Sequence, residues 1–107
     1  AFTYARDAGL KVSIAGVRHS MGGQAFAPGV VLLDMRTLRH IRVDAERKVV
    51  AVGSGVTWHD LQTALHPRFA VQAMQSTDIF SVGGSISVNA HGMDHRLGSV
   101  GTSVRSM

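Results

Sequence analysis

Two glycine-rich segments, one near each end of the chain, are the feature that most constrains its fold. The first, residues 15–24, reads Ala-Gly-Val-Arg-His-Ser-Met-Gly-Gly-Gln and follows an alternating apolar stretch. The second, residues 81–92, has two adjacent glycines, three serines and an Asn-x-His-Gly end. Because glycine lets the backbone approach another group closely, each segment predicts either a ligand-contacting turn or close packing between elements. The chain has 12 glycines in 107 residues, which is about 11% against an average near 7%.

Composition narrows the class of protein. A hydrophobic fraction of 45% and a charged fraction of 17% exclude intrinsic disorder, and 107 residues fit at most one domain. The absence of cysteine excludes disulfides, thiolate metal sites and a cysteine nucleophile within these residues. No apolar run is long enough to span a bilayer. The net charge of +4 is compatible with nucleic acid, with an anionic nucleotide ligand, or with an ordinary solvated surface.

Periodicity in the first half predicts alternating helix and strand. Residues 1–9 are typical of the end of a helix that Gly9 stops, and residues 11–16 of a short strand. The continuous apolar run 30–33 predicts a strand buried on both faces. Residues 41–44 and 49–52 flank a polar turn and predict a hairpin.

The second half predicts a capped helix and a small-residue element. Thr57 is placed to cap a helix from Trp58 to Leu65, which Pro67 ends. Residues 69–71 predict a short strand. Residues 81–91 alternate as a strand does, but their small side chains also fit a tightly packed helix, which we favour. Residues 103–107 are typical of the start of a further strand, so we expect both ends to lie inside a longer α+β domain.

The first glycine segment carries donors suited to an anion. Successive N–H groups can converge there, with a guanidinium from Arg18, a hydroxyl from Ser20 and an amide from Gln24. It is neither a Walker loop nor a dinucleotide-binding G-x-G-x-x-G fingerprint, and the alternative is a plain connection between strands. His19 is either a loop histidine bonded to backbone or a neutral ring nitrogen held beside a cofactor.

Other chemistries have weaker support. His91 and His95 are four residues apart, but Gly92 weakens the helix that a metal pair requires, so we expect no metal. No G-x-S-x-G nucleophile elbow occurs. The basic stretch at residues 36–42 contains no aromatic residue, and we interpret it as a solvated strand edge rather than a nucleic-acid surface.

Taken in order, five stretches resemble the FAD-binding domain of the vanillyl-alcohol oxidase / p-cresol methylhydroxylase (PCMH-type) flavoproteins. The likeness spans nearly the whole chain, and the ordered set is far more specific than any one motif. The matching stretches are residues 14–20 (Ile-Ala-Gly-Val-Arg-His-Ser), 31–35 (Val-Leu-Leu-Asp-Met), 52–58 (Val-Gly-Ser-Gly-Val-Thr-Trp), 80–92 and 98–107.

The resemblance implies FAD as cofactor and two groups of contacts. The first loop is expected near the pyrophosphate through Gly16, Val17, Arg18, His19, Ser20 and Met21, with Gln24 beside the cofactor. The second segment is expected on the other side through Ser81, Gly83, Gly84, Ser85, Ser87, Asn89, His91 and Gly92. His19 matches a histidine that many members link to the flavin 8α-methyl carbon. A second, cysteinyl link is unavailable in this segment.

The resemblance also implies an incomplete enzyme. We expect a fragment of a PCMH-type fold, a small mixed sheet with helices and the start of a second subdomain. The substrate domain, and with it the acid–base residue, would lie elsewhere. The expected activity is hydride transfer to flavin from an alcohol, polyol, sugar or aldonolactone, with no nucleic-acid partner. The alternative is a non-catalytic nucleotide- or nucleic-acid-binding module, for which steeply salt-dependent binding is expected.

Overall fold

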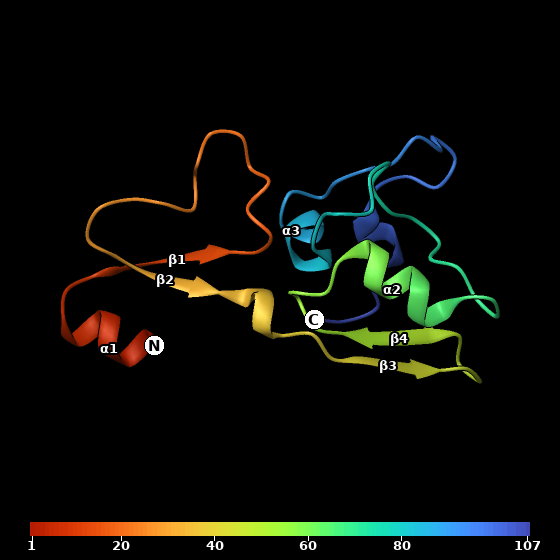
Figure 1. Cartoon of the computed structure of the whole chain (residues 1–107), viewed down its shortest axis with the longest axis horizontal. Helices are drawn as coiled ribbons and strands as arrows, with labels where there is room; N and C mark the ends of the chain where they lie inside the picture. Colours follow the sequence, from red (N-terminus) through yellow and green to blue (C-terminus); the bar gives the residue numbers. More distant parts are fainter.

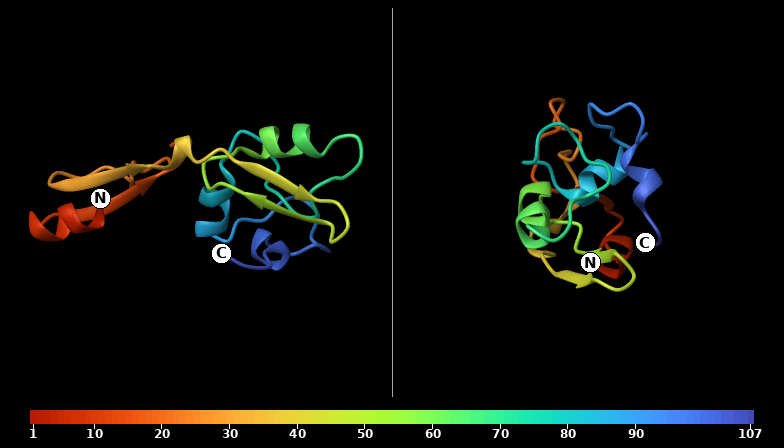
Figure 2. Two further views of the ribbon diagram at one scale, coloured as in Figure 1. Left: turned by 90° about the horizontal axis from the view of Figure 1, so that it is seen from below. Right: turned by 90° about the vertical axis from the view of Figure 1, so that its right-hand side faces the viewer.

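The computed structural model describes residues 1–107 as two parts that lie end to end (Figures 1 and 2). The molecule is elongated, with extents of 47 × 27 × 20 Å. In chain order, the elements are α1 (Phe2–Asp7), β1 (Lys11–Ala15), β2 (Val30–Asp34), η1 (Met35–Thr37), β3 (Ile41–Asp44), β4 (Val49–Val52), α2 (Trp58–Leu65), α3 (Val82–Ser87) and η2 (Val100–Ser103).

The first part consists of α1 and the parallel pair β1–β2. Gly9, at φ +64°, ends α1 as predicted. The two strands pair from Lys11 opposite Val30 to Ala15 opposite Asp34, so both end at the same edge. The loop 16–29 leaves that edge and returns along the pair (Figure 1).

The second part holds the hydrophobic core. The hairpin β3–β4 forms with the predicted bounds, from Ile41 opposite Val52 to Asp44 opposite Val49. Helix α2 begins at a capping box in which Thr57 Oγ1 accepts from Asp60 N and the Asp60 side chain accepts from Thr57 N. The buried core side chains come from α2, α3, η2 and the segment before α2: Val56, Trp58, Leu61, Leu65, Val82 and Val100.

Backbone pairing joins α3 to the segment before α2. Trp58 N donates to Phe80 O at 3.1 Å, and Val82 N donates to Val56 O at 2.8 Å, on either side of an isolated bridge between Thr57 and Ser81. The start of α3 is thereby held against the core, and it faces the end of β1 (Figure 1).

Several expectations are corrected. The strands form two separate pairs, one parallel and one antiparallel, rather than one mixed sheet. Strand β2 is half-buried, not buried on both faces, because β1 is the only element with which it makes extensive contacts and neither face is fully covered. Residues 69–71 form no strand, and residues 100–103 form a 3₁₀ turn followed by unpaired chain. Residues 82–87 are helical, as favoured. No helix combines the length and the apolar character that crossing a membrane requires.

Candidate functional site

The loop that follows β1 lies directly against the start of α3. A Cβ atom placed on Gly16 would stand 2.5 Å from Ser81 Oγ, closer than real Cβ contacts come. Glycine at position 16 therefore permits the approach of two segments about 65 residues apart in the chain. Residues of both predicted segments are brought together here.

The same loop carries backbone donors without acceptors. The N–H groups of residues 17–22 donate no hydrogen bond, although Gly23 N and Phe26 N, further along, close turns onto Ser20 O and Gly23 O. Unpaired N–H groups on an exposed turn form the kind of concave donor array that receives phosphate oxygens. The loop therefore has backbone N–H donors that are available to a ligand.

His19 is the loop residue whose side chain contacts the second part. Its imidazole lies against the ring of Phe80, with ring centroids 5.3 Å apart and planes at 87°. Phe80 is half-buried and packs on the hydrophobic core, so one side of the imidazole rests on a fixed surface while His19 itself stays exposed.

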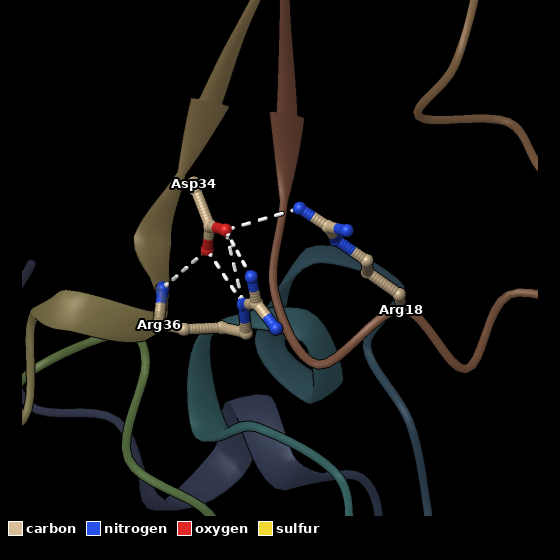
Figure 3. Close-up of polar contacts among 3 residues, drawn as sticks. All are labelled: Arg18, Asp34 and Arg36. Carbon is tan, nitrogen blue, oxygen red and sulfur yellow. Dashed lines mark hydrogen bonds and ion pairs between the residues drawn. The ribbon is translucent and has the colours of Figure 1, made fainter.

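The side chain of Arg18 forms an ion pair with Asp34 at the edge of the parallel strand pair (Figure 3). Its Nη2 donates to Asp34 Oδ2 at 3.0 Å, and its guanidinium lies 5.4 Å from the centre of the Phe26 ring. Arg36 approaches the same carboxylate through Nε, at 2.9 Å from Oδ1, and through its backbone N–H. The hydrogen bond from the Arg36 side chain is the largest of the influences that hold the pKa of Asp34 well below its usual range. The cluster formed by Arg18, Asp34 and Arg36 therefore contains two cations and one carboxylate that stays ionised at neutral pH.

The start of α3 offers no free donors of its own. Val82 N and Gly83 N are taken by Val56 O and Ser54 O, and Gly84 N donates to Ser81 Oγ at 3.3 Å. A Cβ on Gly83 would lie 2.6 Å from Ser54 Cβ. Close packing, the alternative interpretation of these glycines, is thus present at Gly83.

Ser85 and Ser87 already have partners within the second part. Ser85 is 1% exposed, and its hydroxyl accepts from Trp58 Nε1 at 2.8 Å and also contacts Gln75 Oε1. Ser87 is exposed and bonds back to Gly83 O. A cofactor contact by Ser85 remains a prediction, whereas its observed role is to hold Trp58.

The remaining predicted residues lie in two groups, one at the end of the second segment and one in the first loop. Asn89, with φ +47°, accepts from Gly101 N at 3.3 Å, and the exposed His91 pairs with Ser99 in an isolated bridge. Gly92 packs on the carbonyl of Met74. In the first loop, Val17 is half-buried, and the exposed side chains are Ser20, Met21 and Gln24.

Other candidate sites are less suited to a nucleotide. A pocket of about 400 Å³ lies between α2 and the start of β3 and contains none of the predicted site residues. Two cations of the basic stretch, Arg36 and Arg39, are paired with Asp34 and Asp60. No group of three or more metal-ligating side chains comes together.

The structure shows a small α+β domain in which a loop with unpaired N–H groups lies against the start of α3. Comparison with known proteins gives the family to which this domain belongs. The family model described as "FAD binding domain" matches residues 1–107. The decaprenylphosphoryl-beta-D-ribose oxidase of Mycolicibacterium smegmatis is 34% identical over 106 residues, which is 96% of this chain and 23% of that protein. Cholesterol oxidase from Brevibacterium sterolicum, solved as a single-site variant, shares the fold with a TM-score of 0.73 and 24% identity, over 83% of this chain and 18% of that chain.

The chain belongs to the FAD-binding domain family, and its cofactor is FAD. The resemblance to the PCMH-type FAD-binding domain is therefore confirmed, together with the α+β fold class. The chain spans about a quarter or less of the length of these relatives, which are both named as oxidases.

Sequence reasoning missed two residues that shape the site. Phe80 belongs to a matching stretch but carried no expected role, and Asp34 marked only the end of a strand. The signal for Asp34 was its place at the end of a strand parallel to β1, since parallel strands end at one edge. Nothing local marks Phe80 as the partner of His19, because 61 residues separate them.

Proposed function

We propose that this chain is the FAD-binding portion of a flavin-dependent oxidoreductase that oxidises an alcohol, polyol, sugar or aldonolactone. The observation that carries the proposal is the loop 16–22, with unpaired N–H groups and a histidine, pressed against the start of α3. The two relatives named as oxidases support the reaction class. The bound flavin supplies the hydride chemistry.

The residues of the first loop bind and orient. The N–H groups of residues 17–22 and the guanidinium of Arg18 would hold the pyrophosphate, because charge-assisted bonds to phosphate are strong and directional. Ser20 and Gln24 would add neutral donors from the same exposed rim. Across from them, Ser81, Gly84, Asn89 and His91 would line the second side, with Gly83 and Gly92 keeping that side thin.

We further propose that His19 carries a covalent link to the flavin. Phe80 supports one side of the imidazole, which keeps the ring from turning away and shortens the search for reactive geometry. In such a link, one ring nitrogen of His19 would take the place of a hydrogen of the 8α-methyl carbon, and His19 would give up its ring proton. Two electrons and two protons pass in total to an external acceptor such as dioxygen.

The test uses the full-length protein, purified and precipitated in acid. A histidyl link leaves fluorescent flavin in the washed precipitate of the wild type and none in that of His19→Ala. His95→Ala is the matched control, since His95 is an exposed loop histidine without a hydrogen bond partner. Retention of flavin by His19→Ala would assign the link to another residue.

Other outcomes distinguish the covalent link, the FAD-binding site and the nucleic-acid-binding alternative. A flavin absorption band that is lost on acid washing of the wild type would reject the link and retain the binding site. A protein without a flavin band that binds DNA or RNA with steep salt dependence would favour the nucleic-acid-binding alternative.

A further inference from the structure

Asp34 lies at the edge of the parallel strand pair from which the loop 16–29 begins. It is the last residue of β2 and pairs in register with Ala15, the last residue of β1, so its carboxylate stands beside the start of the loop. Arg36 holds that carboxylate through its side chain and its backbone N–H. Arg18, 16 residues earlier in the chain, donates to Oδ2 of the same carboxylate, an oxygen that Arg36 also contacts (Figure 3).

Arg18 has a backbone conformation that needs such a restraint. Its φ is +64°, in the left-handed region, which is strained for a residue other than glycine. Strain of this kind persists only where the surroundings determine the conformation. Here the restraints are the ion pair with Asp34 and the contact with the Phe26 ring.

The conformation of Arg18 sets the direction in which the loop continues. A residue with positive φ bends the backbone in the opposite sense to ordinary residues. The next residue is His19, whose ring rests on Phe80. The unpaired N–H groups lie on both sides of the same residue.

We propose that Asp34 is a positioning residue for the cofactor: by holding Arg18, it keeps the loop 17–22 in the conformation that presents its N–H groups and His19. The inference rests on the proposed function and adds a residue that need not touch the cofactor. A charge-only view of Asp34 gives the opposite expectation, because removing a carboxylate beside an anion site should strengthen anion binding. Whether removal of the Asp34 charge weakens or strengthens FAD binding therefore distinguishes the positioning role from a pure charge effect.

The measurement is FAD affinity, by fluorescence titration of flavin-free full-length protein carrying His19→Ala, in which the proposed link cannot form. Asp34→Asn in this background is expected to weaken FAD binding roughly tenfold, the scale of one charge-assisted hydrogen bond. The matched control is Asp94→Asn. Asp94 makes the same side-chain and backbone bonds to the arginine two residues on, Arg96, but holds no loop cation.

Two further variants keep the outcome decisive. In an Arg18→Gln background, Asp34→Asn should have no more than about a twofold further effect, because the two residues act as one unit. Asp34→Glu retains the charge and displaces the carboxylate, so positioning predicts weakened binding and charge alone predicts none. It decides the matter if Asp34→Asn does not fold.

The inference is overturned if folded Asp34→Asn binds FAD as tightly as the His19→Ala parent, or more tightly. It is also overturned if the effect of Asp34→Asn is unchanged without Arg18. If the parent protein binds no FAD at any concentration, the proposed function fails instead.

Discussion

The imidazole of His19 stands nearly perpendicular to the ring of Phe80, with centroids 5.3 Å apart, although 61 residues separate them in the chain. The contact joins the exposed cofactor loop to a side chain anchored on the core. The contact thus holds a side chain of the first part against the core of the second part.

Replacing Phe80 should therefore loosen His19. Phe80→Leu keeps an apolar side chain on the core but removes the aromatic partner, and such ring pairs contribute about 0.5–1.5 kcal/mol. We expect a lower fraction of protein-linked flavin after acid precipitation, with total flavin binding less affected. An unchanged linked fraction would show that the loop alone orients the imidazole.

A methyl group on Gly16 should push the loop away from α3. Gly16→Ala places its Cβ 2.5 Å from Ser81 Oγ, and overpacking of this kind costs about 1–3 kcal/mol. Ser81→Ala alone loses the bond to Gly84 N, but it removes the oxygen that obstructs position 16, after which the nearest atom is Ser81 Cβ at 3.5 Å.

The two changes should therefore be less damaging together than their sum. Chemical denaturation of the two single variants and the double variant measures the coupling, which we expect to be favourable. Strict additivity would mean that the two segments are apart in solution.

Truncation of Ser85 should leave a buried donor unsatisfied. Ser85→Ala removes the acceptor of Trp58 Nε1–H, and an unpaired buried polar group costs about 1–3 kcal/mol. Trp58 is the only tryptophan of these 107 residues and is 4% exposed, so an emission change caused by Ser85→Ala reports on its surroundings.

We expect a shifted emission maximum and a lower unfolding midpoint for Ser85→Ala. The companion variant Trp58→Phe has no N–H to satisfy, so adding Ser85→Ala to it should cost less. An equal cost in both backgrounds would contradict the importance of this hydrogen bond.

The capping box of α2 should give stability that depends on pH. The hydrogen bond from the Thr57 side chain is the main cause that lowers the pKa of Asp60 from its ordinary value. A carboxyl group with a lowered folded pKa stabilises fully above its unfolded pKa, about 4, and loses that contribution as pH falls through the folded value.

Thr57→Ala should thus cost about 1 kcal/mol at pH 7, the usual effect of losing an N-cap. The difference from the wild type should shrink below about pH 4, as Asp60 takes up a proton in both proteins. Urea denaturation at pH 7 and pH 3 measures it, with Thr63→Ala, at an exposed position of the same helix, as the control.

The amino-acid sequence alone determined the elements whose signals are local. The hairpin β3–β4, the Thr57 cap and the stop at Gly9 depend on neighbours a few residues away, where steric limits and short hydrogen bonds act. The helix within residues 81–91 is favoured partly by the family resemblance, because its local pattern also fits a strand. The ordered motifs also identified the FAD-binding family.

Only the tertiary structure decided how the two glycine segments meet. The contacts Gly16–Ser81 and His19–Phe80 join residues more than sixty positions apart, and no local energy favours one such pairing over another. Likewise, Asp34 reaches Arg18 because β1 and β2 end at a common edge. Those arrangements depend on the burial of a shared core and on the register of paired strands, which are properties of the whole chain.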